Sequence, residues 1–147
     1  MRVYLDNCAF NRPFDDQSHI RNRLEAEAKL YIQALIKDGS LDLVWSYILE
    51  MENDHNPFQE KRNAIAKWKR LSISDILESA SIITNAKELM SLGVKSKDAL
   101  HVSCAIEGKA DYFITTDDKL INKLIGCKQI LVVNPITLAG YLDAHAN

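Results

Sequence analysis

Residues 96–120, SKDALHVSCAIEGKADYFITTDDKL, carry the pattern that decides the fold. Apolar side chains recur three and four positions apart over residues 97–107, which predicts a helix that ends at Gly108. The apolar run at 111–115 predicts a buried strand, and a short helix is expected to follow over residues 118–125. A helix, a buried strand and another helix in this order indicate an α/β protein.

The remainder of the chain continues this alternation. Further strands are predicted from short apolar runs at 2–5, 41–45, 71–74 (an edge strand) and 130–134. Further helices are predicted at 20–37, from 46 to about 54, at 58–70, at 75–91 and from Pro135 onward. Ser46 and Ser96 are the expected N-caps of the helices that follow them. We therefore expect one domain over residues 1–147, with three α/β/α layers and a central, mainly parallel sheet of four or five strands.

Two local expectations concern the N-terminal part of the chain. A polar loop should follow the first strand, with residues Asn11, Pro13, Asp15 and Asp16. In the helix at 20–37, the stripe expected to be buried consists of Leu24, Ala28, Tyr31 and Leu35. The charged residues Glu25, Glu27, Lys29 and Lys37 lie mostly off this stripe.

The composition excludes several classes of protein. The chain is 47% hydrophobic and 26% charged, with a net charge of −2 and a pI of about 6.1, which does not support a generally basic nucleic-acid binder. No apolar run approaches the roughly 18 residues of a membrane span, and no signal peptide is evident. Cys8, Cys104 and Cys127 are odd in number and lack metal-ligand spacing, so we expect a reduced, cytoplasmic protein in which they pack as apolar residues.

Four acids stand where a carboxylate is costly unless a cation meets it: Asp6, Glu52, Asp98 and Asp117. Asp6 and Asp117 follow predicted parallel strands, and the crevice of such a sheet lies at the carboxyl ends of its strands. Each also has a purely structural alternative. Asp6 could form a turn, Asp117 could cap the next helix, and Asp98 could complement a helix dipole.

Helical spacing predicts which side chains point inward. Asp98, His101, Val102 and Ala105 share one stripe, so Asp98 should face the crevice, with His101 as a packing or supporting residue. Trp45, Ile48, Leu49 and Glu52 have the same spacing, which makes Glu52 the inward acid and Glu50 the solvated one. A bend at the start of this helix would exchange the two glutamates.

The segments VYLDNCAFNRP, WSYILEMEN and SKDALHVSCAIEGKADYFITTDDKL together resemble a PIN domain, the fold named from the PilT N-terminus. The resemblance covers nearly the whole chain and is most specific in the C-terminal third. It implies a ribonuclease that cuts single-stranded RNA with Mg²⁺ or Mn²⁺. Many bacterial PIN domains are toxins paired with an antitoxin protein, so such a partner is expected here as well.

By this resemblance, Asp6, Glu52, Asp98 and Asp117 form the acidic quartet that is both catalytic and metal-binding. Asp6, Asp98 and Asp117 would anchor the metal, and Glu52 would bind a metal-held water or a second cation. The supporting polar residues are Asn7, Ser46 and Thr115, of which Thr115 would orient water or phosphate. The Glu50/Glu52 pair departs from the family pattern, because it leaves the second acid ambiguous.

Three other readings compete with this one. A haloacid-dehalogenase-like phosphatase would use Asp6 as a nucleophile, but it usually has a second acid where this chain has Cys8. A non-catalytic PIN-like module would bind RNA or a protein through a metal-free site. A dinucleotide-binding domain is disfavoured, because no glycine-rich loop follows the first strand.

The chain has more apolar residues in its middle than one sheet face needs: Phe58, Ile65, Trp68, Leu71, Ile76, Leu77, Ile82, Ile83, Leu89 and Met90. An excess of apolar surface marks a partner site, and PIN domains often pair, so we expect a homodimer that uses these helices. Basic residues are spread along the chain at Arg12, Arg21, Arg23, Lys61, Arg62, Lys95, Lys97 and Lys119. Lys61, Arg62 and Lys95 are expected to line a basic route to the acids. The alternatives are a well-covered monomer and solvated surface charges.

Overall fold

Five parallel strands form the centre of the computed structural model, which describes residues 1–11 and 19–145. The strands are β1 (Arg2–Leu5), β2 (Asp42–Ser46), β3 (Ser74–Ile76), β4 (Tyr112–Ile114) and β5 (Leu131–Val133). Their order in the sheet is β3-β2-β1-β4-β5, and every neighbouring pair is parallel. The predicted α/β class and its central parallel sheet are confirmed.

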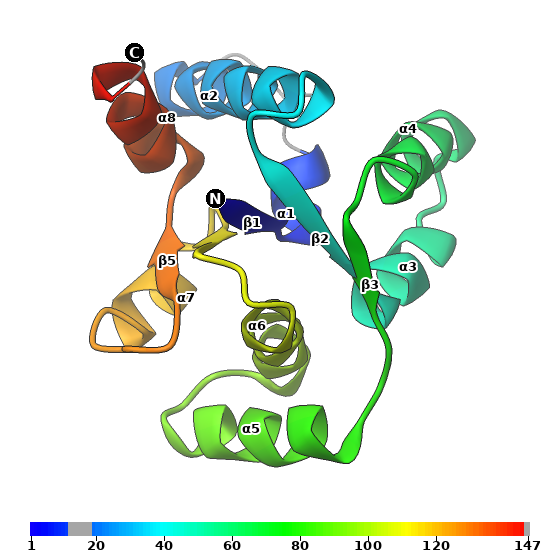
Figure 1. Ribbon diagram of the computed structural model, residues 1–147, viewed down its shortest axis with the longest axis vertical. Helices are drawn as coiled ribbons and strands as arrows, with labels where there is room; N and C mark the ends of the chain where they lie inside the picture. The colour runs from blue at the N-terminus through cyan, green and yellow to red at the C-terminus, as the bar shows by residue number, and fades with distance from the viewer. Residues whose placement is uncertain (12–18, 146–147) are drawn as a thin grey trace.

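Helices cover both faces of this sheet (Figure 1). In the described part of the chain they are α1 (Asn7–Asn11), α2 (Ile20–Lys37), α3 (Tyr47–Asp54), α4 (Gln59–Lys69), α5 (Ala80–Ser91), α6 (Ser96–Glu107), α7 (Asp118–Lys123) and α8 (Pro135–Ala144). Helices α2 and α8 pack side by side on one face, whereas α6 packs on the other face with α5 beneath it. This arrangement gives the expected three layers.

The buried strands explain why this sheet forms. Val3, Tyr4 and Leu5 of β1 have no exposed surface, and the same holds for Phe113 and Ile114 of β4. Strands that are apolar on both faces are stable only where both faces are covered, as in a parallel α/β sheet. The rings of Tyr4 and Phe113 stack with centroids 5.3 Å apart, so the two central strands are also joined through their side chains.

The segment directly after β1 is a helix, not the predicted polar loop. Helix α1 begins at Asn7, and the Phe10 ring packs against Trp45 and Trp68 with centroids 5.8 and 6.3 Å away. Burial of this aromatic side chain stabilises a short helix in a sequence that otherwise favours a turn. The rest of the predicted loop, with Arg12, Pro13, Asp15 and Asp16, lies outside the described residues.

The boundaries of three other elements also differ from the prediction. The edge strand β3 begins at Ser74 instead of Leu71, because residues 74–76 are those that pair with β2. Helix α5 therefore begins later than expected, after Ser79, whose hydroxyl accepts a hydrogen bond from the Ile82 amide. Ser96 is the first residue of α6 and not its cap.

Helix α2 has the predicted bounds, but it buries a different stripe. Ala28, Ile32 and Ile36 face the core, together with the charged Glu25 and Lys29. The predicted stripe was wrong at its start, where the side chain of Leu24 is 48% exposed. Contacts with α8 decide this rotation, since Asn134 at the start of α8 donates a hydrogen bond to Glu25.

Helix α6 crosses closely over the sheet at its C-terminal end. Gly108 follows the helix, and a Cβ atom built there would lie 2.6 Å from Val44 Cγ1 and 3.3 Å from Ile76 Cδ1. A side chain at this position would therefore push against β2 and β3. None of the helices in the described ranges is long and apolar enough to span a membrane.

Candidate active site

Four carboxylates from four segments face one hollow at the carboxyl edge of the sheet. Asp6 directly follows β1, Asp117 lies just past β4, Glu52 belongs to α3 and Asp98 to the first turn of α6. The hollow has a volume of about 410 Å³, and its lining residues are Asp6, Asn7, Cys8, Glu52, Lys97, Asp98, Thr116 and Asp117. This edge is where open parallel α/β sheets bind their ligands. The structure thus brings together all four acids singled out in the sequence.

Asp6 is held by hydrogen bonds from both sides. Its Oδ1 accepts a bond from the Asn7 amide at 2.7 Å, and its Oδ2 accepts one from Thr115 Oγ1 at 2.9 Å. The backbone amide of Asp6 also donates to the Ile114 carbonyl at 3.0 Å, which continues the pairing of β1 with β4. These bonds fix a carboxylate that is only 7% exposed.

Asp117 caps α7 and faces the hollow at the same time. Its Oδ1 accepts hydrogen bonds from the amides of Lys119 and Leu120 at 3.0 and 3.3 Å. Its own amide donates to Thr115 Oγ1 at 3.1 Å. Thr115 is fully buried, so its hydroxyl connects Asp6 and Asp117 and does not line the hollow. Thr116, which the sequence did not single out, lines the hollow instead.

Asp98 is a half-buried acid whose charged form is disfavoured. Burial is the largest cause of its raised pKa, and the negative charges of Asp6, Asp117 and, more weakly, Glu52 raise the pKa further. His101 acts in the opposite direction. The four carboxylates therefore lie close enough to repel one another.

The two glutamates of α3 point in different directions, as the helical phase predicts. The side chain of Glu52 is 16% exposed and reaches the hollow, where its Oε2 accepts a hydrogen bond from Asn7 Nδ2 at 3.2 Å. Glu50 instead pairs with Lys69 at 2.5 Å, and both of these side chains are exposed. Glu52 is thus the acid that α3 contributes to the hollow.

A buried polar chain supports Glu52 from behind. His101 Nε2 bonds to Glu52 Oε1, and His101 Nδ1 lies 2.7 Å from the Tyr4 hydroxyl. Burial alone would raise the pKa of Glu52, but the hydrogen bond with His101, together with nearby Lys97 and Asn7, outweighs it and lowers the pKa. Tyr4 was missed in the sequence, because a tyrosine in a buried strand gives no sign of which polar group it meets.

The donor atoms of the hollow suit a hard divalent cation. All four acids offer carboxylate oxygens, the ligands that Mg²⁺ and Mn²⁺ prefer. Asn7 Oδ1 adds a buried oxygen that has no hydrogen-bond partner among the described residues. Within residues 1–11 and 19–145, no three His, Cys, Asp or Glu side chains already form a metal-binding arrangement. A cation would therefore have to draw the carboxylates closer together.

Comparison with known proteins adds to this geometry. The family model described as the PIN domain matches residues 3–124. The chain belongs to the PIN domain family. The resemblance seen in the sequence is thereby confirmed. No match was found among proteins of curated function.

Two solved structures share this PIN fold. A chain of VapBC2 from Rickettsia felis, solved bound to a DNA fragment from their promoter, has a TM-score of 0.55 and 17% sequence identity, with 91% of this chain and 98% of that chain covered. A chain of VapBC-1 from nontypeable Haemophilus influenzae has a TM-score of 0.60 and 16% identity, with 92% and 98% covered. At such low identities, these similarities support the fold.

Cys8 is the cysteine of the PIN domain that lies at the hollow. Its Sγ donates to Asp6 Oδ2 at 3.3 Å and accepts a hydrogen bond from Thr116 Oγ1 at 3.3 Å. Burial, followed by the charge of Asp6, raises the pKa of Cys8 to about 11. The thiol therefore stays protonated at neutral pH, which does not suit a nucleophile.

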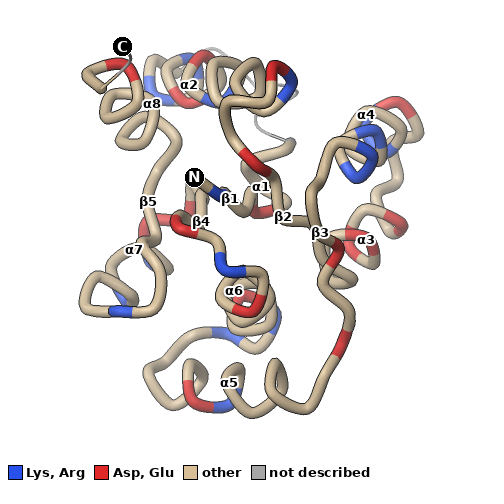
Figure 2. The backbone as a smooth tube through the Cα atoms, viewed as in Figure 1, with Lys and Arg blue, Asp and Glu red and all other residues tan. Residues whose placement is uncertain are grey.

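Of the three basic residues expected to line a route to the PIN acids, Lys95 lies beside them, but Lys61 and Arg62 do not. Lys97 lines the hollow itself, and Lys95, Lys119 and Lys123 line a smaller one that shares Asp98 and Asp117 with it. Helix α4 also carries basic residues (Figure 2), but Arg62 donates to the Asn56 carbonyl at 2.8 Å, and Lys61 Nζ lies 4.8 Å from the Phe58 ring centroid. Neither Lys61 nor Arg62 lines the acidic hollow, so that part of the predicted basic route is wrong.

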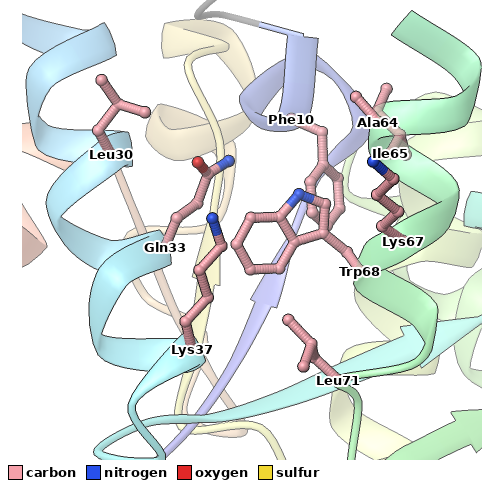
Figure 3. Close-up of a pocket in the computed structure, with 9 residues that line it drawn as sticks. All are labelled: Phe10, Leu30, Gln33, Lys37, Ala64, Ile65, Lys67, Trp68 and Leu71. Carbon is pink, nitrogen blue, oxygen red and sulfur yellow. The ribbon is translucent and has the colours of Figure 1, made fainter. Parts of the chain in front are cut away.

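A second, more apolar hollow of about 290 Å³ lies between α2 and α4 of the PIN domain (Figure 3). Its lining residues are Phe10, Leu30, Gln33, Lys37, Ala64, Ile65, Lys67, Trp68 and Leu71. The Trp68 ring faces Gln33 and Lys37 across the hollow, and Lys37 Nζ lies 5.2 Å from the ring centroid. Apolar side chains at the rim stay exposed, with Leu30 at 54% and Leu71 at 44%.

The apolar residues expected at a dimer interface divide into two groups. Ile65, Trp68, Ile82 and Leu89 are buried within the chain itself. Phe58, Leu71, Leu77 and Met90 remain exposed, and Ile76 and Ile83 are half-buried. Part of the apparent excess is therefore used in packing α4 and α5, and the homodimer remains a prediction that rests on the exposed group.

Proposed function

We propose that this PIN domain is a metal-dependent nuclease that hydrolyses phosphodiester bonds in single-stranded RNA. The observation that carries the proposal is the convergence of Asp6, Glu52, Asp98 and Asp117 on one hollow, where burial and mutual repulsion raise the pKa of Asp98. Carboxylates forced together in this way favour a bound cation, because it neutralises their charge. The family supports nuclease chemistry as the use of such a site.

The four acids and Asn7 are the residues that would hold Mg²⁺ or Mn²⁺. A divalent cation in such a site neutralises phosphate charge and activates water for hydrolysis. The protein itself supplies orientation: Thr115 fixes Asp6, the backbone of α7 fixes Asp117, and Asn7 Nδ2 holds Glu52. Asp6, Asp98 and Asp117 are assigned as anchors of the cation and Glu52 as the ligand of a second cation or of water.

Lysine side chains support a polyanionic substrate. Lys97 stands within the acidic hollow, and Lys95, Lys119 and Lys123 continue beside it. Lysines around an acidic, cation-binding centre attract the phosphates on either side of the bond to be cut. The preference for RNA follows the resemblance to PIN ribonucleases.

The direct test is cleavage of a fluorescently labelled single-stranded RNA by the purified chain. We expect cleavage with Mg²⁺ or Mn²⁺ and its loss on addition of EDTA. Asp98→Asn should abolish cleavage, whereas Asp143→Asn, an exposed acid at the end of α8, should leave it unchanged. Calorimetric titration with Mn²⁺ should show binding that Asp98→Asn weakens.

The result that would contradict the proposal is cleavage that survives chelation. Tight binding of RNA with no cleavage in any divalent cation would favour the alternative function, a non-catalytic RNA-binding module. Absence of both binding and cleavage would point to a protein ligand. A matched single-stranded DNA of the same sequence tells whether the 2′-hydroxyl of RNA is needed.

We also propose that the protein is the toxin of a toxin–antitoxin pair. Support comes from the fold, which it shares with chains of two VapBC assemblies. The apolar hollow between α2 and α4 supports a protein partner, because Leu30 and Leu71 are exposed there and Lys37 and Lys67 flank them. An antitoxin segment with apolar and acidic side chains would match this surface.

Co-expression with the product of a small reading frame next to its gene tests the pairing. The two proteins should purify together, and growth arrest caused by this chain alone should be relieved. Leu30→Glu should weaken the complex, because it places a negative charge in the apolar hollow. Leu92→Glu is the control, because this leucine is also exposed, at 62%, and lies outside that hollow.

A further inference from the structure

A continuous line of buried polar atoms runs from the start of α3 to the acidic hollow. Ser46 Oγ lies 2.6 Å from the Tyr4 hydroxyl, which lies 2.7 Å from His101 Nδ1. His101 Nε2 then bonds to Glu52 Oε1. Ser46 and Tyr4 have no exposed surface and His101 has 1%. Buried polar groups are stable only when each of them has a hydrogen-bond partner. The donor and the acceptor of each bond in this line can therefore be assigned.

The donors and acceptors of this line point in one direction. A carboxylate accepts hydrogen bonds, so the bond between His101 Nε2 and Glu52 Oε1 places a hydrogen on Nε2. In a neutral imidazole the other nitrogen is then an acceptor, and Nδ1 takes the hydrogen of Tyr4. The Tyr4 hydroxyl is both a donor and an acceptor, so it can supply this hydrogen to Nδ1, 2.7 Å away. Ser46 can in turn donate to the Tyr4 oxygen.

Packing holds each member of the line in place. The Tyr4 ring stacks on Phe113 at 12° and meets the His101 ring edge-on at 67°, with centroids 5.3 and 5.8 Å away. Ser46 Oγ also accepts a hydrogen bond from the Leu49 amide and so caps α3, the helix that carries Glu52. The line therefore begins at Ser46, the last residue of β2 and the N-cap of α3, passes through β1 and α6, and ends at Glu52 of α3.

We propose that Tyr4 and His101 are positioning residues of the nuclease site. Tyr4 selects the Nε2–H tautomer of His101, and His101 then holds Oε1 of Glu52 so that Oε2 stays on the side of Asn7 and the hollow. The proposal rests on the nuclease function proposed above. Apolar residues could fill the same space in the core but could not make these hydrogen bonds. Tyr4 and His101 therefore have a role in addition to packing.

The tautomer can be observed directly by ¹⁵N NMR of the imidazole nitrogens in the full chain. The chain has 4 histidines, and the His101 signals are assigned by their loss in His101→Gln. We expect Nε2 to carry the hydrogen in the wild type. Tyr4→Phe removes one hydroxyl and keeps the stacked ring, and it should shift His101 toward a mixture of tautomers. A wild-type His101 with its hydrogen on Nδ1, or a tautomer unchanged by Tyr4→Phe, would overturn the proposal.

Kinetics provide the second readout. Gln keeps an N–H donor near the position of Nε2, whereas Leu fills the same space without one. We expect His101→Leu to lower kcat roughly 10- to 100-fold, as loss of an outer partner of a metal-site ligand does, with little change in KM for RNA. His101→Gln should recover most of the loss. Equal kcat for His101→Leu and the wild type would overturn the proposal.

Circular dichroism on heating shows whether each variant is folded. If His101→Leu does not fold, Tyr4→Phe takes its place in the kinetic comparison, and an unchanged kcat would again overturn the proposal. Failure of the nuclease function gives a different pattern. A wild type without activity refutes the nuclease, while the ¹⁵N spectra of the wild type and Tyr4→Phe still decide whether the positioning line exists.

Discussion

Thr115 Oγ1 donates a hydrogen bond of 2.9 Å to Asp6 Oδ2, and 109 positions in the sequence separate the two residues. The same hydroxyl oxygen accepts the Asp117 amide at 3.1 Å. A single buried side chain thus fixes the distance between two acids of the hollow. Its role is to position carboxylates that are far apart in the sequence, which differs from the contact with water or phosphate expected from the sequence.

Thr115→Val tests this role. The variant keeps the shape of the side chain but removes the hydroxyl that donates to the Asp6 carboxylate and accepts from the Asp117 amide. We expect a loss of about 1–3 kcal/mol in the free energy of unfolding, measured by urea denaturation, together with reduced RNA cleavage. Thr115→Ser should restore both. Thr137→Val, at an exposed position of α8, should change neither.

The two glutamates of α3 give a second comparison. Glu52→Gln should lower kcat by about 100-fold or more. Loss of an outer partner of a metal-site ligand costs about 10- to 100-fold, and loss of a ligand itself should cost at least as much. Glu50→Gln removes only the exposed pair with Lys69, which is worth about 0–1 kcal/mol, so cleavage should persist. Cleavage that fails in Glu50→Gln but not in Glu52→Gln would assign the second acid to Glu50.

The raised pKa of Asp98 makes stability depend on pH with a definite sign. The folded state keeps a proton on Asp98 at pH values where the unfolded chain, with the ordinary pKa of 3.8, has lost it. The folded state thus binds more protons, and stability falls as pH rises from 3.8 through the raised pKa. Asp98→Asn should remove this fall and raise the melting temperature modestly at pH 7.

Divalent cations extend this prediction. Mn²⁺ binds the folded state and should raise the melting temperature of the wild type by mass action, but it should do so less for Asp98→Asn. Differential scanning fluorimetry from pH 3.5 to 8, with and without Mn²⁺, measures both effects. A variant that melts below the wild type at pH 7 would show instead that Asp98 stabilises α6 as a first-turn acid.

Part of this architecture can be predicted from the sequence. The strands at 2–5 and 112–114 are short apolar runs. Because these two strands pair in parallel, the acids that follow them lie at the same edge of the sheet. Helical phase separates Glu52 from Glu50 because buried Ile48 and Leu49 mark the inner face of α3. These features depend on local periodicity and on the rule that parallel strands end together.

Other features depend on partners that are distant in sequence. Helix α1 is stabilised by the packing of Phe10 against Trp45 and Trp68. The sequence of residues 7–11 does not predict these two contacts. Glu25 of helix α2 faces the interior, where it accepts a hydrogen bond from Asn134. The spacing of apolar residues predicts that a segment is helical, but it does not determine which of two adjacent faces is buried. The contacts that determine the buried face form only in the folded chain.

The close crossing of α6 over β2 predicts a stability difference between two glycines. Gly108→Ala places a Cβ atom 2.6 Å from Val44 Cγ1 and should cost about 1–3 kcal/mol of unfolding free energy through overpacking. Gly140→Ala, within α8 and with no atom within 4 Å of the new Cβ, should stabilise the protein by about 0.4–1 kcal/mol. Chemical denaturation measures both. Equal effects would mean that α6 shifts freely away from β2.

The homodimer is tested by multi-angle light scattering at micromolar concentrations. We expect a mass of twice the 16.7 kDa of one chain, with dissociation on dilution. Leu77→Glu, at a leucine that is 69% exposed just before α5, should shift the mass toward one chain. Ile125→Glu, at an isoleucine 74% exposed and outside the expected interface, is the control. A single-chain mass throughout the dilution series would rule out the dimer.

The strand order has a consequence for synthesis of the protein on the ribosome. Strand β4 pairs directly with β1, although more than 100 residues of the chain separate the two strands. A nascent polypeptide that has not yet reached residue 115 carries Asp6 and Glu52 without Asp117 and without the hydroxyl of Thr115 that holds Asp6. The acidic cluster is therefore complete only after residue 117 has been translated, and a shorter nascent chain lacks the site at which we propose that RNA is cut.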